Sequence, residues 1–293
     1  GVNQTISAQA YGNLVISGSG IKTAATAFSV AGDLTIQGGA LNTNATAVTH
    51  TVSGNFIMTG GSLTGTNSTY LLNGSANQQL QLLSSLVKLS VNKPAGHVVL
   101  GSDITVNTTL TFIKGLIQTD TYAVNIASSG SVTGAGTSTG WVNGYLRRNI
   151  PTGASITRSF EIGNATDYTP ASVTFANVAV SGTLTGSITA NDHPELAYSG
   201  IDSAKSVNKV WDFTNSGTSF STASVTLNWN TPDVDAGANS GSFKAGIFNA
   251  SSWTLPSIST LTPASLQATG LTAFGEFAVG EKVQIIKWTG NDF

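Results

Sequence analysis

A short segment occurs twice near the start of the chain, and this repeat constrains the fold more than any other feature. Residues 30–41 read VAGDLTIQGGAL and residues 52–63 read VSGNFIMTGGSL, which gives a 22-residue period. In each copy apolar and polar residues alternate, which is the period of a β-strand rather than of a helix. A repeat of this length in strand-forming sequence is typical of a parallel β-solenoid, in which each turn of the chain stacks on the previous one.

The repeat predicts both the interior and the corners of the solenoid. We expect Leu34 and Ile36 to stack on Phe56 and Met58, because the two pairs occupy equivalent positions. The Gly-Gly pair that follows each of these strands allows a positive φ at a tight corner. We predict a right-handed parallel β-solenoid over residues 1–143, with about six turns spaced about 4.8 Å apart, and we expect it to continue upstream.

The 22-residue rhythm is lost after residue 143, although strand-like alternation continues. Runs such as ASVTFANVAV, SVNKVWDF and ASVTLNWN follow one another at irregular spacing. Several short alternating strands over this length predict an antiparallel, immunoglobulin-like β-sandwich over residues 144–281. No helix longer than one turn is expected. Residues 282–293, KVQIIKWTGNDF, are predicted to be a linker or the start of another module.

Composition restricts the setting and the partners. Only 9% of the residues are charged, against about a quarter in ordinary globular proteins, and this hydroxyl-rich surface favours an extracellular location. The net charge is −2 and no basic cluster exceeds Arg147–Arg148, which excludes a nucleic-acid partner. No apolar run approaches the roughly 20 residues of a membrane-spanning helix. The absence of cysteine excludes disulfides, thiolate catalysis and thiolate metal sites.

The order of several short phrases carries a family resemblance. In chain order they read KPAGHVVLGSDITVNTTLTFIKGLI, GWVNGYLRR, IGNATDYTPASV and LTAFGEFAVGE. This order resembles the very large repetitive surface proteins of the Bacteroidota that are exported by the type IX route, and the resemblance covers residues 1–281. It implies a β-helical block followed by a sandwich, a location at the bacterial cell surface and a role as an adhesin or fibre component. We therefore expect the chain to be one link in a longer array.

Enzymes with a β-helix fold need clustered carboxylates, or a basic residue beside calcium, on one face of the solenoid. Within residues 1–143 the only acids are Asp33, Asp103 and Asp120, and the residue equivalent to Asp33 in the second copy is Asn55. These acids are predicted to be isolated and solvated at turns. We assign no catalytic residue.

The histidines do not form a metal-binding motif in the sequence. His50, His97 and His193 are far apart. The segment NDHPEL does gather Asp192, His193 and Glu195, but its proline and the alternating side-chain directions oppose a convergent site. We predict that this segment is a loop without a metal or catalytic role.

The segment DVDAGAN is the best candidate for a cation site. Asp233, Asp235 and Asn239 stand at its first, third and seventh positions, a spacing that lets oxygen atoms converge on one hard cation. The twelfth position of this motif is Lys244, where a helix-loop-helix calcium site has a bidentate acid. We predict an Asx-rich turn between two sandwich strands, with calcium left open as a ligand.

Most of the aromatic residues are predicted to fill the core of the sandwich. Trp211 and Trp229 lie in alternating strand sequence, at positions that should face inwards. Trp253 follows two serines and is the tryptophan that we single out for exposure.

These observations predict a non-enzymatic structural and adhesive module of a large secreted cell-surface or fibre-forming repeat protein. The predicted partners are neighbouring modules or copies of the same protein, with extracellular glycans as a further ligand class. Two alternatives stay open, a carbohydrate-binding module and a polysaccharide lyase or glycosidase of the β-helix type. Saturable glycan binding without turnover would identify the first, and product release would identify the second.

Overall fold

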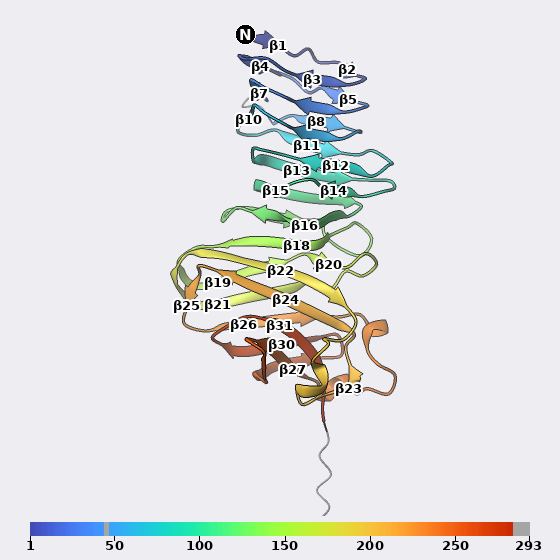
Figure 1. Cartoon of the computed structure of the whole chain (residues 1–293), viewed down its shortest axis with the longest axis vertical. Helices are drawn as coiled ribbons and strands as arrows, with labels where there is room; N and C mark the ends of the chain where they lie inside the picture. Colours follow the sequence, from blue (N-terminus) through green and yellow to red (C-terminus); the bar gives the residue numbers. More distant parts are fainter. Residues whose placement is uncertain (44–46, 284–293) are drawn as a thin grey trace, which may run out of the picture.

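The chain is all-β, as predicted, with 59% strand and 3% helix. The computed structural model describes residues 1–43 and 47–283. Its first part is a β-solenoid of about eight turns, coloured blue to green in Figure 1. Helical structure in the described residues is limited to three 3₁₀ segments: η1 (Leu196–Tyr198), η2 (Thr231–Asp233) and η3 (Ser240–Ser242). Most of the predicted linker, residues 284–293, lies outside the described residues.

The solenoid consists of short strands that stack in parallel, turn upon turn. In chain order these strands are β1 (Gln4–Thr5), β2 (Ala10–Tyr11), β3 (Leu14–Ile16), β4 (Ile21–Thr23), β5 (Ser29–Val30), β6 (Leu34–Ile36), β7 (Ala40–Asn42), β8 (Thr49–Val52), β9 (Phe56–Met58), β10 (Ser62–Thr64), β11 (Thr69–Leu72), β12 (Gln78–Gln81), β13 (Leu86–Asn92), β14 (Val98–Leu100), β15 (Ile104–Lys114), β16 (Ile117–Ile126), β17 (Ser131–Thr133) and β18 (Val142–Ile150).

The predicted interior stack is confirmed. Strands β6 and β9 pair in parallel, with Leu34 opposite Phe56 and Ile36 opposite Met58. All four side chains are fully buried. Burial of each such side chain contributes about 1.5–3 kcal/mol relative to exposure, so the stacked apolar positions hold successive turns in register.

The turns vary in length, which the regular 22-residue period did not predict. Gln4 pairs with Lys22, a shorter step than that period, whereas Ile117 pairs with Val142, a longer step. The strands must keep their register to preserve the buried stack, but a corner can gain or lose residues at the surface. Many turns are shorter than 22 residues, and the parallel strand pairing continues past residue 143. The solenoid therefore has about eight turns instead of the predicted six.

The glycine corners behave as expected. Gly39 and Gly61 have φ angles of 66° and 71°, in the region that favours glycine. A Cβ atom on Gly61 would lie 2.5 Å from the carbonyl oxygen of Gly39 in the neighbouring turn. A larger residue at this corner would therefore force the two turns apart.

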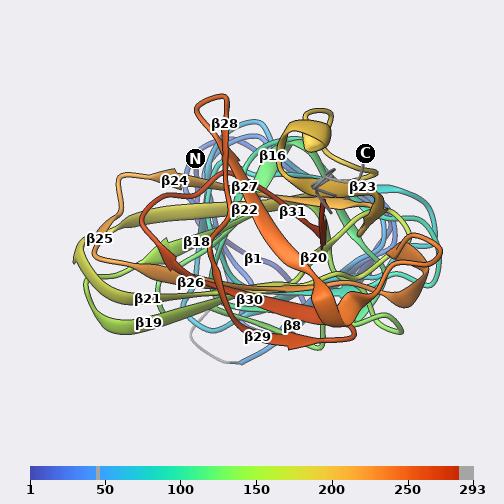
Figure 2. The same ribbon diagram turned by 90° about the horizontal axis from the view of Figure 1, so that it is seen from below.

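Antiparallel pairing replaces the solenoid in the second part of the chain, which forms two layers, one above the other in Figure 2. One layer has the strand order β19-β21-β26-β30-β29, with β25 beside β21, and the other contains β22, β24, β31, β27 and β28, with β23 beside β31. The bounds of these strands are β19 (Gly153–Phe160), β20 (Ile162–Gly163), β21 (Ala171–Val180), β22 (Gly182–Ala190), β23 (Ile201–Ser206), β24 (Lys209–Ser216), β25 (Ser219–Phe220), β26 (Ala223–Asn228), β27 (Lys244–Asn249), β28 (Ser252–Thr254), β29 (Ser257–Thr262), β30 (Ser265–Leu271) and β31 (Glu276–Lys282).

Aromatic side chains fill much of the core of this second part. The ring of Phe213 lies 5.2 Å from that of Phe160 and 5.8 Å from that of Phe277, both edge to face. Trp211 and Trp229 are 0% and 3% exposed. Their predicted place in the core is confirmed.

Strand β18 belongs to both parts of the molecule. Its first residue, Val142, stacks in parallel between Ile117 of β16 and Ile162 of β20. Its later residues pair with β22 in antiparallel fashion, from Leu146 to Ile150. The expected boundary after residue 143 therefore passes through one continuous strand, and Figure 1 shows the sheet running on from the solenoid into the second part.

Candidate functional site

The acids and amides of the early solenoid hold successive turns together. Oδ1 of Asn13 accepts a hydrogen bond from the backbone N–H of Asp33 at 2.7 Å. Oδ1 of Asp33 accepts one from the N–H of Asn55 at 2.7 Å, and Oδ1 of Asn55 one from the N–H of Gln79 at 2.8 Å. Each side chain thus satisfies a donor of the turn stacked on it. The recurring Gly-Asx-apolar sequence at residues 12–14, 32–34 and 54–56 is the signal that could have revealed this ladder.

The two other acids of the solenoid also contact protein groups. Asp103 accepts a hydrogen bond from the N–H of Ala123 at 2.9 Å and forms an ion pair with Arg147 at 3.1 Å. Asp120 accepts a hydrogen bond from the Gln118 side chain at 2.7 Å. These carboxylates are not simply solvated, as the sequence suggested, because they fix the backbone and side chains around them.

A buried histidine lies inside the solenoid. His50 is 0% exposed, and its ring lies 4.2 Å from that of Phe28 and 5.5 Å from that of Tyr70. Nδ1 accepts a hydrogen bond from the backbone N–H of Phe28, and Nε2 has no partner in the described part of the chain. Burial lowers the pKa of His50 from 6.5 to about 4.

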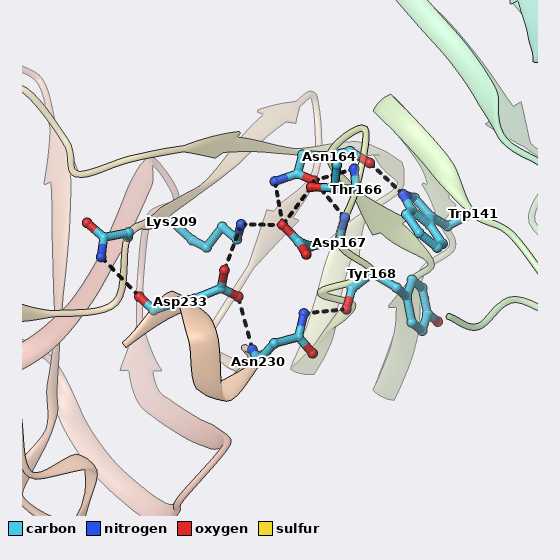
Figure 3. A network of polar contacts seen from close by, with 9 residues as sticks. Trp141, Asn164, Thr166, Asp167, Tyr168, Lys209, Asn230 and Asp233 are labelled. Carbon is cyan, nitrogen blue, oxygen red and sulfur yellow. Dashed lines mark hydrogen bonds and ion pairs between the residues drawn. The ribbon is translucent and has the colours of Figure 1, made fainter. Parts of the chain in front are cut away.

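A buried lysine links the solenoid end to the antiparallel layers (Figure 3). Lys209 opens strand β24 and is only 3% exposed. Its Nζ lies 2.9 Å from Oδ1 of Asp233 and 3.0 Å from Oδ2 of Asp167. Burial opposes the charge, but the hydrogen bonds to these two carboxylates outweigh it and raise the pKa of Lys209 above its ordinary value. The charged ammonium therefore holds both carboxylates.

The turn that carries Asp167 is anchored to the last part of the solenoid. Oδ1 of Asn164 accepts hydrogen bonds from the backbone N–H groups of Thr166 and Asp167, at 2.9 and 2.7 Å. The indole Nε1 of Trp141 donates to the carbonyl oxygen of Asn164 at 2.8 Å, and its ring lies 5.7 Å from that of Tyr168. Figure 3 shows this continuous set of contacts from the tryptophan to the lysine.

The three residues that the sequence suggested as calcium ligands form hydrogen bonds or ion pairs with different neighbours. Asp233 holds the buried lysine, whereas Oδ2 of Asp235 accepts a hydrogen bond from the N–H of Ser206 at 2.8 Å. Asn239 accepts one from the N–H of Gly241 at 3.1 Å. The segment joins β26 to β27, in keeping with the predicted turn. Among the described residues, no group of three or more His, Cys, Asp or Glu could hold a metal ion, and calcium binding by this loop stays a prediction.

The NDHPEL segment packs over the outer surface of the second part through its histidine. His193 is 5% exposed, and its Nε2 lies 3.0 Å from Oε2 of Glu276. Its Nδ1 accepts a hydrogen bond from the backbone N–H of Glu195 at 3.0 Å, which leaves the proton on Nε2 for Glu276. The imidazole ring lies 4.6 Å from that of Phe248 and 4.9 Å from that of Trp253.

Strand register brings two acids and two aromatic residues into one row beside this histidine. Asp212 of β24 pairs with Glu276 of β31, Glu276 with Phe248 of β27, and Phe248 with Trp253 of β28. All four are partly exposed, whereas the aromatic residues on either side of Asp212 are buried. Sequence reasoning singled out Trp253 but missed the row, because its members come from four different strands and no local motif connects them.

The environment of Asp212 disfavours its charged form. Burial, and then the neighbouring charge of Glu276, raise the pKa of Asp212 from 3.8 to about 6. Across the described residues, no group donates a hydrogen bond to the Asp212 carboxylate, while Glu276 has His193 as its partner. Asp212 is therefore the acid of the row that remains available to an external donor.

Comparison with known proteins identified no relative of this chain. No family model, no curated protein and no solved structure matches the chain. Within the described residues, no helix is long and apolar enough to cross a membrane.

Proposed function

We propose that this chain is a non-enzymatic structural and adhesive module of a large secreted surface protein, in which the solenoid and the antiparallel layers act as one stiff rod. The observation that carries this proposal is strand β18, which pairs in parallel with the solenoid and in antiparallel fashion with β22. A sheet that continues through the junction transmits force along backbone hydrogen bonds instead of through a flexible linker.

Buried ion pairs support a rigid junction. Lys209 joins Asp167 of the turn after β20 to Asp233 of η2. At the same junction Arg148 of β18 lies 2.5 Å from Glu161, and both side chains are largely buried. Removing one partner of a buried pair typically costs about 3–5 kcal/mol, because the remaining charge is left uncompensated. Relative motion of the two parts would break these pairs and is therefore opposed.

The handedness of the solenoid, the immunoglobulin-like sandwich and the cellular location are further parts of this proposal. A right-handed solenoid is favoured because parallel crossover connections are almost always right-handed. An immunoglobulin-like sandwich is supported by the two antiparallel layers and their aromatic core. An extracellular or bacterial cell-surface location, with neighbouring modules or copies as partners, is supported by the low charge content and by the resemblance. Antibody labelling of intact source cells tests the location.

Replacement of the buried lysine tests the stiff junction. We expect Lys209→Met to lower the free energy of unfolding by about 3 kcal/mol and to separate the unfolding of the layers from that of the solenoid. Denaturant unfolding followed by tryptophan fluorescence and by circular dichroism measures both effects. Lys205→Met is the matched control, since Lys205 is half-exposed and 3.9 Å from Glu281, and it should cost less than about 1 kcal/mol.

Two results would contradict a stiff junction between the solenoid and the layers. Two separate transitions in the parent protein would show that the solenoid and the layers are not coupled. A Lys209→Met variant as stable as the Lys205→Met control would show that the buried pairs do not hold the junction.

The enzyme alternatives are tested directly. The full chain is incubated with neutral and acidic polysaccharides, with and without calcium, and released oligosaccharides are measured. We expect no product. Reproducible product release would identify a polysaccharide lyase or glycosidase and would overturn the non-enzymatic proposal.

A further inference from the structure

We propose that the hollow between Tyr198, Phe248 and Trp253 binds a glycan that carries protonated amino groups. This inference names a ligand class for the adhesive role proposed above and rests on that role alone, not on the stiffness of the junction. It combines a set of aromatic faces, a surrounding set of carboxylates and a backbone that holds them in place.

The hollow is a surface cavity of about 610 Å³, lined by Glu195, Tyr198, Phe248, Ser251, Ser252 and Trp253. Small-molecule and sugar-sized ligands generally occupy cavities of about 300–1,000 Å³ that combine apolar walls with a few polar groups. A second hollow of about 500 Å³ is also lined by Phe248, together with Asp212 and Glu276. Because Phe248 lines both hollows, the two adjoin at this residue.

The aromatic residues supply the apolar walls. Tyr198 is 80% exposed at the end of η1 and has no part in the core. Trp253 is only partly exposed, and its Nε1 donates to the carbonyl oxygen of Glu195 at 2.9 Å. The ring of Phe248 lies 5.2 Å from that of Trp253. Aromatic faces pack against the C–H faces of pyranose rings and attract cations through their π-systems.

The charges around the hollows select the class of glycan. Glu195 lines the first hollow, and Asp212 and Glu276 line the second, while no lysine or arginine is among the described residues that line either. An acidic polysaccharide would meet like charges only. A neutral sugar would leave the charge of Glu195 unmatched and Asp212 without an ionic partner. An amino sugar places its ammonium group where both carboxylates and aromatic faces favour it.

The site is preorganised. His193 is buried against the rings of Phe248 and Trp253 and its Nε2 lies 3.0 Å from Glu276, so it helps to hold these three side chains in place. At the tip of the β27–β28 hairpin, Ala250 and Ser251 have φ angles of 48° and 62°, which are uncommon for residues other than glycine. A site that is already ordered loses little conformational entropy when it binds a ligand.

The test is calorimetric titration of the full chain at pH 6 with a glucosamine tetramer, whose amines are protonated, and with its N-acetylated counterpart. We expect saturable binding of the amine form and at least tenfold weaker binding of the acetylated form. Absence of binding to the amine tetramer would overturn the proposal. Equal affinity for the two tetramers would overturn the assigned role of the carboxylates.

Two variants assign the binding to this hollow. We expect Tyr198→Ala to weaken binding about tenfold by loss of an aromatic face, and Glu195→Gln to weaken the amine form while leaving the acetylated form unchanged. Tyr122→Ala, at another exposed tyrosine on β16 of the solenoid, is the matched control and should bind as the parent does. Binding that survives both Tyr198→Ala and Glu195→Gln would place the glycan elsewhere and refute the proposed site.

Discussion

The buried histidine of the solenoid makes the stability of this protein sensitive to acid. His50 is fully enclosed, and its Nδ1 faces the N–H of Phe28, which donates to it. Protonation would place a second donor against that N–H and a charge among aromatic rings. Burial also removes water from the charged form, and this desolvation lowers the pKa from 6.5 to about 4 in the folded protein. A group with a lowered folded pKa contributes stability above its unfolded pKa and loses it as the pH falls towards the folded value.

The size of the effect follows from these two pKa values. Between pH 7.5 and pH 4.5 the unfolded state takes up nearly one proton at this site and the folded state only a fraction of one. With about 1.36 kcal/mol per pKa unit, the linked loss of stability is about 2.5 kcal/mol. His50→Phe removes the titrating group and keeps an aromatic ring between Phe28 and Tyr70. It gives up the acceptor for one backbone N–H, which costs about 1 kcal/mol at pH 7.5.

Denaturant unfolding at pH 7.5 and pH 4.5 measures the prediction. We expect the parent to lose about 2.5 kcal/mol more stability than His50→Phe over this interval. Met58→Leu, at a buried apolar position of the same solenoid, is the control and should retain the parental pH dependence. If His50→Phe shows the same pH dependence as the parent, the histidine is not held neutral by burial and the reasoning fails.

Two further predictions concern single carboxylates. Asp33→Ala removes the acceptor for the N–H of Asn55 and should lower the free energy of unfolding by about 1 kcal/mol. Asp33→Asn keeps the acceptor and should leave the stability unchanged. If thermal unfolding shows the same loss of stability for both variants, the hydrogen bond to Asn55 does not contribute to stability. Asp212→Asn should raise stability at pH 7.5, because the charged form is disfavoured in the fold, by about 1 kcal/mol once solvent screening is allowed for. That gain should vanish as the pH falls through 6 towards 3.8, and a gain that is independent of pH would contradict the raised pKa.

Local patterns in the sequence were enough to predict the solenoid. Leu34 and Ile36 alternate with polar residues and recur as Phe56 and Met58, and the structure stacks them as expected. The corner glycines could also be predicted from the sequence, since Gly39 and Gly61 adopt a backbone conformation that other residues rarely adopt. The Asx ladder was present in the same repeat, although only the structure showed that each side chain bonds to the next turn.

The number of turns and the junction depended on tertiary structure. Turn length is set at corners, where residues are added or lost without disturbing the stack, so one exact repeat did not give the period of the whole solenoid. The change from parallel to antiparallel pairing within β18 depends on which strand lies beside it. That strand is β22, which follows only after β19 and β21 have paired in the opposite layer, so no local pattern near β18 encodes the change.

The candidate glycan site was decided by tertiary structure alone. Asp212 and Glu276 are ordinary acids in their own strands, and they become neighbours because β24 and β31 pair in one particular register. The same register sets Phe248 and Trp253 beside them. A local sequence repeat fixes a solenoid because each turn contacts the next one along the chain. Antiparallel layers join strands that are distant in sequence, and their contacts are chosen by packing of the whole core.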